Sequence, residues 1–331
     1  MEMRRVCVSL VFVVCVLVMQ FEALAEPVVP GYKVETFATD LLYPDWICFD
    51  PTGVMYVGSN NWSTPEPVYR ISPEGQVAWF GPALVDTDGG VYDVDGRISG
   101  VPGSILVAGS CFSPSYLTAI HPDGTGEQIW GPESVPWKNG GFSKFDSTGR
   151  WLMTELTIDG STSRVHQITG KAPPTELFHV AVTSDGPPMI AVDAQDNILL
   201  TYHQTRGWLT IGRWSPDGTP DGTLLDGLAV STYFNPIAFG PGGVWGNDLH
   251  LIANGSLYRL DSSANLTALG TGFDDVYVDM GFSPMDGALY LTDNVGGRIL
   301  RVSPIIPAPG ALLLGGIGAG LIGGLRRRRK L

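Results

Sequence analysis

Ile47-Cys-Phe-Asp50-Pro-Thr-Gly53-Val-Met-Tyr-Val57 is the stretch that decides the fold, because it joins an apolar strand, a tight turn and a second apolar strand. The same order returns at residues 141–153, 190–200, 237–243 and 280–291, and in a weaker copy at 91–107. Consecutive copies carry an apolar anchor residue every 43 to 51 positions. The anchors are Phe49, Val94, Phe145, Val192, Phe239 and Phe282. Repeats of about 40–50 residues with four short strands each are typical of a β-propeller.

A second turn recurs between the outer strands of the repeats. Its copies are Ser72-Pro-Glu-Gly75, His121-Pro-Asp-Gly124 and Ser215-Pro-Asp-Gly218. Proline at the second position presets φ, and glycine at the fourth suits a type I turn. Residues 26–304 therefore predict an all-β, six-bladed β-propeller. Two β-sandwich domains are the alternative, but they do not account for the spacing of the anchors.

The last repeat is one strand short. It supplies apolar strands at 278–282, 288–292 and 298–303, while an unassigned strand at 32–38 precedes the first repeat. Because propellers leave no long sheet edge unpaired, we expect residues 32–38 to complete the sixth blade. The N-terminal strand then closes the ring and brings both ends of the body together.

Residues 1–25 have the order of parts of a secretory signal peptide. Arg4 and Arg5 precede an apolar run at 6–19, and the small residues Ala23 and Ala25 flank Leu24. This combination predicts export through the secretion machinery and cleavage after Ala25. The alternative is an uncleaved anchor, although the apolar run is short for a membrane span.

Residues 305–331 form a second signal at the other end. Pro307-Ala308-Pro309-Gly310 is followed by an uncharged stretch at 311–325 and by five basic residues at 326–330. Basic residues after an apolar segment stay in the cytoplasm. We therefore expect short helical segments at both termini and a body tethered outside the inner membrane by its C-terminal helix.

The C-terminal segment resembles the PEP-CTERM sorting signal, with Ala308 where that family has glutamate. The resemblance implies that an exosortase-type enzyme recognises and removes the tail. It also implies transient insertion into the inner membrane, followed by release to the cell surface or the extracellular space.

Composition limits the partners. The chain has 331 residues and a net charge of −13, and the five basic residues of the tail contribute +5 to it, so the body alone carries −18. Such a body repels phosphate backbones, which excludes nucleic acid as the expected partner. Only Cys48 and Cys111 fall in the body. Free buried thiols are the favoured state, and a disulfide is the alternative.

Polar residues at the strand ends are the candidate ligands of a central channel, because propellers bind ligands at the channel mouth. Asp45, Asn139, Asp185 and Asn235 precede inner strands, and His203 and Asp293 end second strands. Carboxylates and amides around one axis suit Ca²⁺ or another divalent metal. The alternative is that these residues cap turns.

Two acidic stretches begin like calcium-binding loops. Asp86-Thr-Asp88-Gly89 and Asp93-Val-Asp95-Gly96 have Arg97 and Ser104 at their twelfth positions, where an EF-hand needs glutamate. We interpret both stretches as ordinary solvated loops.

The repeat, as in Phe49-Asp50-Pro51-Thr52-Gly53 and Asp185-Gly186, resembles SMP-30/gluconolactonase-like and NHL-type propellers. The lactonase branch implies a Glu, an Asn and an Asp about four residues before the anchors, around one metal. Asp45 and Asn235 meet that spacing, and Asp185 is shifted by three residues. The other copies place Gly90, Gly141, Pro188 and Val278 there.

The sequence contains no Ser-His-Asp order, HExxH, P-loop or GxSxG motif. The leading hypothesis is therefore a non-catalytic binding or surface- and matrix-associated protein with a glycan or protein ligand. Tryptophans near expected loops offer stacking surfaces for a glycan, namely Trp62, Trp137, Trp208 and Trp245. The alternative is an SMP-30-like, metal-dependent lactonase or hydrolase that uses Asp45, Asp185 and Asn235.

Overall fold

The structure is a computed structural model that describes residues 26–60, 64–109, 116–131, 139–157, 159–183, 188–231, 234–273 and 277–305, with only the backbone at 139 and 140. All regular structure in these ranges is β-sheet. They contain no helix of the length and apolarity that crossing a membrane requires. The expected signals and terminal helices, with Ala23, Ala25 and Pro307 to Gly310, lie outside the described residues.

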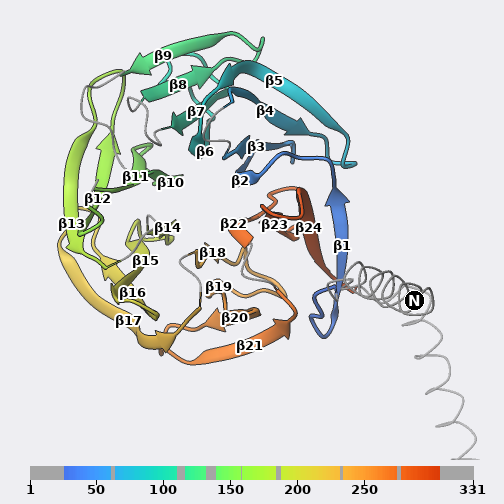
Figure 1. The fold of residues 1–331 in the computed structure, drawn as a ribbon, viewed down its shortest axis with the longest axis vertical. Coiled ribbons are helices and arrows are strands. Elements are labelled where there is room, and N and C mark those ends of the chain that lie inside the picture. The colour runs from blue at the N-terminus through green and yellow to red at the C-terminus, as the bar shows by residue number, and fades with distance from the viewer. Residues whose placement is uncertain are drawn as a thin grey trace, which may run out of the picture.

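Six antiparallel, four-stranded sheets are arranged around one axis, as the prediction required (Figure 1). Blade 1 contains β2 (Pro44–Phe49), β3 (Met55–Ser59), β4 (Glu66–Ile71) and β5 (Val77–Leu84); blade 2 contains β6 (Thr87–Asp93), β7 (Ser104–Gly109), β8 (Tyr116–Ile120) and β9 (Gly126–Trp130); blade 3 contains β10 (Asn139–Phe145), β11 (Trp151–Leu156), β12 (Thr162–Ile168) and β13 (Thr175–Ala181). Blade 4 contains β14 (Met189–Val192), β15 (Ile198–Thr205), β16 (Trp208–Trp214) and β17 (Pro220–Ala229); blade 5 contains β18 (Ile237–Phe239), β19 (Leu249–Ala253), β20 (Ser256–Leu260) and β21 (Leu266–Thr271); blade 6 contains β22 (Tyr277–Phe282), β23 (Leu289–Asp293), β24 (Arg298–Pro304) and β1 (Tyr32–Ala38).

The N-terminal strand closes the ring. β1 pairs antiparallel with β24, with Val34 opposite Val302 and Thr36 opposite Leu300. A bridge between Val28 and Thr271 continues the contact onto blade 5. Figure 1 shows β1 as the outermost strand of the last blade. The predicted closure is confirmed.

The anchor residues pack in the apolar layers between blades. The ring of Phe49, for example, lies 5.4 Å from that of Tyr290 on the neighbouring blade. One anchor was assigned wrongly: in blade 2 the position is held by Tyr92, which lies opposite Ile105 as Phe49 lies opposite Met55. Val94 follows the strand and is 54% exposed. Val94 is therefore an apolar residue of a turn and does not belong to the core.

Several inner strands carry an irregularity near their start. The register shifts between Pro44 and Ile47 in β2, between Thr87 and Gly89 in β6, and between Tyr277 and Met280 in β22. A bulge re-aims the side chains of the residues that it leaves unpaired. Asp45, Asp88 and Asp279 lie in these three irregular segments.

Aspartates cap the turns between strands. The Asp50 carboxylate accepts hydrogen bonds from the amides of Thr52 and Val54. Asp93, which begins a calcium-like stretch, accepts the amides of Arg97, Ile98 and Ser99 and is only 2% exposed. The expectation of a solvated loop is therefore wrong at Asp93, whose carboxylate is a buried turn cap.

A candidate acidic site at the head of the central channel

The six inner strands run in the same direction along the axis, so their first residues meet at one end of the channel and their last residues at the other. We call these ends the head and the foot. Residues at the foot are the last ones of β2, β6, β10, β14, β18 and β22, which together line one cavity. The head is where the sequence placed its candidate ligands.

Asp45 is a buried carboxyl group at the head. Its residue is 3% exposed, and Asn60 Nδ2 lies 3.5 Å from its Oδ1 atom. Burial raises the pKa of Asp45 well above its usual range, and the negative charges of Asp86 and Asp279 add to this effect. Ionisation of Asp45 without a nearby positive charge is therefore unfavourable.

Asp86 is the second carboxyl group of this site. It lies just before β6, has a left-handed φ of 53° and is 1% exposed. Neither of its carboxylate oxygens has a hydrogen-bond partner among the described residues. Burial raises the pKa of Asp86 to about 6. The next residue, Thr87, ties this segment of the chain to blade 1, because its hydroxyl accepts a hydrogen bond from the amide of Ser59 at 2.9 Å.

A third acceptor at the head lacks a donor. The Oδ1 atom of Asn60 is buried and has no hydrogen-bond partner among the described residues. The nearby phenol of Tyr116 does not serve this purpose, because its hydroxyl donates to the carbonyl of Val85 at 2.5 Å. The head therefore gathers oxygen acceptors from Asp45, Asp86 and Asn60, while the described chain supplies few donors. Such a set suits a cation.

Packing around a tryptophan fixes this end of blade 1. Trp46 is 1% exposed and follows Asp45 directly. A Cβ atom on Gly58 would lie 1.9 Å from its Nε1 atom, and one on Gly90 would lie 2.3 Å from its ring. Only glycine fits at both positions, so Trp46 is held between blades 1 and 2 with Asp45 beside it.

Asp279 lies deeper in the channel and is already satisfied. Its Oδ2 atom accepts the amide of Ile47 at 2.9 Å and its Oδ1 atom that of Met280 at 2.8 Å. The Nζ atom of Lys144 lies 3.9 Å from Oδ1. Burial still raises the pKa of Asp279, although Lys144 opposes this shift.

Asn235 and His203 meet one another at the border between blades 4 and 5. His203 Nε2 lies 3.2 Å from Asn235 Oδ1, and Asn235 Nδ2 donates to the carbonyl of Ile252 at 3.3 Å. Asn235 is fully buried, and burial lowers the pKa of His203. The sequence placed both residues at the channel mouth as ligands, whereas the structure uses them to join two blades.

The other predicted ligands have different outcomes. Asp293 accepts the amide of Gly296 and the Nε atom of Arg298, each at 2.7 Å. These contacts fit the alternative that Asp293 caps the turn between β23 and β24, and its role as a channel ligand stays a prediction. Asp185 lies outside the described residues. Asn139 lies in β10 opposite Leu156, and its side chain is not described.

The corrected anchor also corrects the ligand register. With Tyr92 as the anchor of blade 2, the residue four positions earlier is Asp88 and not Gly90. Asp86 and Asp88 are therefore head residues that were not predicted from the sequence, although Asp86-Thr-Asp88 stands out there as an acidic stretch. Alignment of Tyr92 with Phe49 was the signal that would have placed them there.

No three His, Cys, Asp or Glu side chains among the described residues are grouped closely enough to hold a metal ion. A cation at the head would need the two carboxylates of Asp45 and Asp86 together with the amide oxygen of Asn60. The residues present fit a hard, oxygen-preferring ion such as Ca²⁺, with further ligands to be supplied by water or substrate.

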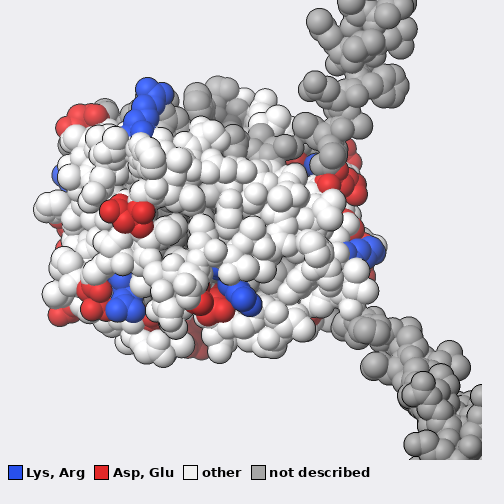
Figure 2. Space-filling model, turned by 90° about the horizontal axis from the view of Figure 1, so that it is seen from below, with Lys and Arg blue, Asp and Glu red and all other residues white. Residues whose placement is uncertain are grey.

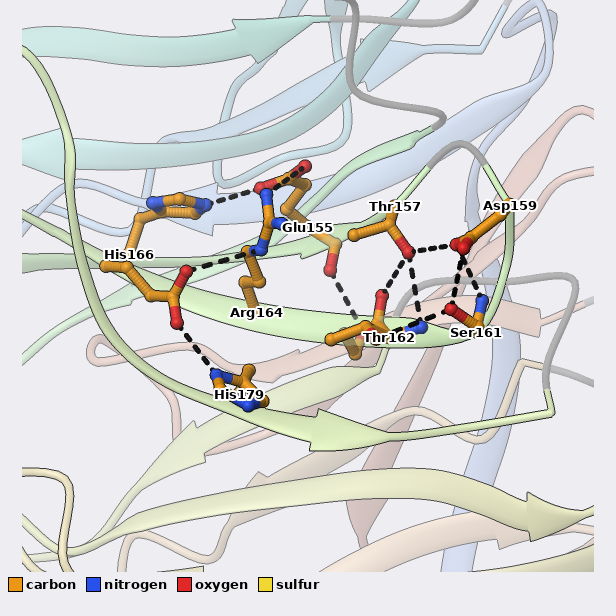
Figure 3. A network of polar contacts seen from close by, with 10 residues as sticks. Glu155, Thr157, Asp159, Ser161, Thr162, Arg164, His166 and His179 are labelled. Atoms are coloured by element: carbon orange, nitrogen blue, oxygen red, sulfur yellow. Dashed lines mark hydrogen bonds and ion pairs between the residues drawn. The ribbon is translucent and has the colours of Figure 1, made fainter.

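A polar network runs through blade 3 (Figure 3). Glu155 on β11 is 2% exposed, and its Oε2 atom lies 2.5 Å from His166 Nε2. Arg164 links Glu155, at 3.6 Å, to Glu176, at 3.3 Å. His179 on β13 continues the network at 2.8 Å from Glu176. These contacts run across β11, β12 and β13, so they tie the outer strands of the blade together.

The remaining side-chain predictions concern thiols, tryptophans and surface charge. Cys48 is a free thiol, and Cys111 lies outside the described residues. Trp245 is 2% exposed and belongs to the core, so its prediction as a stacking surface is wrong, while Trp208 is 49% exposed. Trp62 and Trp137 are not described. Figure 2 shows acidic and basic side chains interspersed over the side of the disc.

Comparison with known proteins identifies the fold. No family model matches the chain, and no curated protein matches it. A gluconolactonase from Xanthomonas campestris is similar in structure, with a TM-score of 0.63 at 12% identity over 85% of this chain and 92% of that one. A luciferin-regenerating enzyme has a TM-score of 0.61 at 13% identity, over 83% and 96%. The PQQ-bound aldose sugar dehydrogenase of Streptomyces coelicolor has a TM-score of 0.59 at 15% identity, over 83% and 99%. The structural neighbours of this chain are thus SMP-30/gluconolactonase-like six-bladed propellers, and at these identities the likeness is one of fold.

Proposed function

We propose that this propeller is an exported, cation-dependent hydrolase of lactones or related esters, with its site at the head of the channel. The observation that carries the proposal is Asp86, a buried carboxylate without hydrogen-bond partners in the described chain, beside the buried Asp45. The shared fold with a gluconolactonase supports the substrate class. This proposal replaces the purely non-catalytic hypothesis as the preferred one.

Two buried carboxyl groups need a compensating charge. Removing an ionised carboxylate from water costs several kcal/mol unless it is paired. Lys144 is placed beside Asp279 and its side chain is 28% exposed, so the described chain offers Asp45 and Asp86 no cation of their own at close range. Either a proton or a bound cation must therefore neutralise them, and at neutral pH a divalent cation is the better match.

Asp45, Asp86 and Asn60 would hold the cation. When bound, a divalent cation supplies a Lewis acid for the carbonyl oxygen of a lactone. The chain's own residues fix the geometry, because Trp46 locks Asp45 and the hydroxyl of Thr87 anchors the segment of Asp86. Burial of the head limits the access of bulk water, which strengthens each electrostatic contact there.

The test is metal content and lactone turnover of the purified chain. We expect stoichiometric Ca²⁺, Mn²⁺ or Zn²⁺ by elemental analysis and hydrolysis of a gluconolactone by pH-stat titration. Asp86→Asn keeps the shape of the side chain and should lower kcat/KM by about a hundredfold or more. Asp95→Asn, at an exposed position in the same blade, is the matched control. If the metal-free protein hydrolyses the lactone at the same rate as the metal-containing protein, the proposal is wrong.

A non-catalytic role remains the second candidate, because no three acidic, His or Cys side chains of the described chain form a metal cluster. In that case the loop face of the propeller would bind a glycan or a protein partner. Bound metal without turnover of any lactone or ester, together with a hit on a glycan array, would favour this role.

Export and sorting belong to the same proposal. The leader at 1–25 and the tail at 305–331 lead us to propose passage through the export machinery, transient tethering in the inner membrane and removal of the tail by an exosortase-type enzyme. The mature protein would then lie at the cell surface or outside the cell. Mass spectrometry of the protein from its native cells should find Glu26 as the first residue and no residues 311–331. An intact tail would contradict removal.

A further inference from the structure

A groove of about 560 Å³ lies at the outer rim of the disc, where blade 6 meets blade 1 and the ring closes. It is lined by residues 36–40, by Tyr69 and Gly75, and by residues 77–79, and we call it the rim groove. Figure 1 shows the end of β1 beside the start of β5, which form its two walls. A volume of this size lies within the usual range of small-molecule sites, roughly 300–1,000 Å³.

Contacts between the two blades fix the shape of the rim groove. The turn after β4 reaches β1 so closely that a Cβ atom on Gly75 would lie 2.5 Å from the carbonyl oxygen of Phe37. The segment after β1 is tied to β4 as well, because the amide of Leu42 donates a hydrogen bond to the hydroxyl of Tyr69 at 3.1 Å. The walls are thus held together at two points, and the groove is formed before any ligand binds.

Trp79 supplies an uncovered aromatic surface on the β5 wall. It lies opposite Tyr69 in the pairing of β4 with β5, so both side chains are on the same face of blade 1. Tyr69 packs into the core with residues of blade 6, whereas Trp79 is 77% exposed and extends this face to the rim. An indole ring in water gains free energy when an apolar surface covers it. The β5 wall therefore favours a ligand with a flat apolar face.

The β1 wall is polar. Thr36, Thr39 and Asp40 line it. The hydroxyl of Thr39 donates to Asp40 Oδ2 at 2.9 Å, and no described residue donates to Asp40 Oδ1. A carboxylate has about four acceptor sites on its two oxygens. Asp40 can therefore accept hydrogen bonds from the hydroxyl groups of a ligand.

We propose that the rim groove binds a neutral oligosaccharide, with one pyranose ring stacked on Trp79 and its hydroxyl groups donating to Asp40. A pyranose with equatorial hydroxyl groups has C–H bonds on its face and donors along its edge, which matches one aromatic and one acceptor wall. The described wall contains no lysine or arginine, so an anionic ligand would meet Asp40 without compensation. A wholly apolar ligand would cover the polar wall without giving it partners.

This binding does not depend on the hydrolase proposed above. Asp45, Asp86 and Asn60 are not among the described residues that line the rim groove. The groove lies on the rim of the disc, whereas the acidic site lies at the head of the central channel. A variant of the groove should therefore leave lactone turnover unchanged.

The test is isothermal titration calorimetry of the purified full-length chain with cellotetraose, a neutral β-1,4-linked glucose tetramer. Trp79→Ala should weaken binding about tenfold or more, because the stacking and the apolar burial of the ring are lost together. Trp79→Tyr keeps an aromatic ring and should retain most of the affinity. Asp40→Asn should weaken binding about threefold, because a neutral amide accepts hydrogen bonds less strongly than a carboxylate. Trp208→Ala removes another exposed tryptophan, outside the groove, and should change nothing.

No binding of cellotetraose to the parent, or equal binding in the parent and Trp79→Ala, would overturn the proposal. Tighter binding of decanoate than of cellotetraose would indicate an apolar ligand and would also overturn it. If Trp79→Ala does not fold, a crystal of the unaltered protein soaked in cellotetraose decides the question. Density for a sugar ring against Trp79 supports the proposal, and a groove without such density overturns it.

Discussion

Lys144 Nζ lies 3.9 Å from Asp279 Oδ1, although the two residues belong to the inner strands of blades 3 and 6, which are opposite one another in the ring. The pair therefore crosses the channel. It lies between the acidic head, where Asp279 raises the pKa of Asp45, and the foot cavity, which Lys144 lines. One ion pair thus separates two chemically different ends of the same channel.

Removal of Lys144 should leave the buried charge of Asp279 without a counter-charge, so the protein should lose stability by an amount that depends on pH. Lys144→Met is expected to lower the free energy of unfolding by about 1–2 kcal/mol at pH 8, less than for a fully buried pair because the lysine is partly exposed. At pH 4 the loss should be smaller, because a protonated Asp279 needs no counter-charge. Urea unfolding at both pH values measures this. Equal losses at pH 4 and pH 8 would show that the pair contributes no electrostatic stability.

Asp86 should make the metal-free protein less stable as the pH rises. Its pKa is raised to about 6, so between about pH 4 and pH 6 the folded state keeps a proton that the unfolded chain has lost. Stability contributed by this proton is present below about pH 4 and is lost as the pH rises through about 6. With EDTA present, the substitution Asp86→Asn should reduce the loss of unfolding free energy over this pH range by an amount on the order of 2 kcal/mol. Asp95→Asn should keep the parent's pH dependence, and an unchanged slope in Asp86→Asn would refute the assignment.

A bound cation should restore the stability that the head loses at neutral pH. Adding Ca²⁺ or Mn²⁺ at about a hundred times its Kd is expected to stabilise the parent by roughly 2.7 kcal/mol at pH 8. Asp86→Asn and Asp45→Asn should respond much less, because each lacks one of the charged ligands. Thermal unfolding by circular dichroism, with Mg²⁺ as a comparison ion, follows the effect. A cation response of equal size in all three proteins would place the ion elsewhere.

Ring closure predicts a large cost for a small change in the last blade. Leu300 is 1% exposed and lies opposite both Thr36 of β1 and Leu291 of β23. Leu300→Ala should lower the free energy of unfolding by about 2–4 kcal/mol. Ile305→Ala, at a position that is 61% exposed, should change it by less than about 0.5 kcal/mol. Urea titration of both variants gives the comparison, and similar losses would contradict a buried closure.

The architecture was readable from the sequence because its signals repeat. Six anchors at nearly constant spacing, and a spare strand before the first of them, require little knowledge of distant contacts. The one misplaced anchor shows the limit: Tyr92 and Val94 are both apolar and two residues apart, so alternation alone does not distinguish them. Only the partner strand does, since Tyr92 lies opposite Ile105.

The site was less predictable, because a polar residue at a strand end has two uses. Asp293 and Asp45 look alike in the sequence, yet the first is neutralised by Arg298 across a local turn and the second faces other carboxylates. Asp279 was not predicted because it lies three residues before its anchor Phe282, whereas Asp45 lies four residues before Phe49. Burial and hydrogen-bond partners decide between cap and ligand, and both depend on neighbouring blades.

The most direct measurement is the anomalous diffraction of a crystal grown with Mn²⁺. The account predicts one strong manganese peak at the head of the channel, within about 2.6 Å of oxygen atoms from Asp45, Asp86 and Asn60. An empty head, with the carboxyl groups of Asp45 and Asp86 bonded to one another or to protein donors, would contradict it.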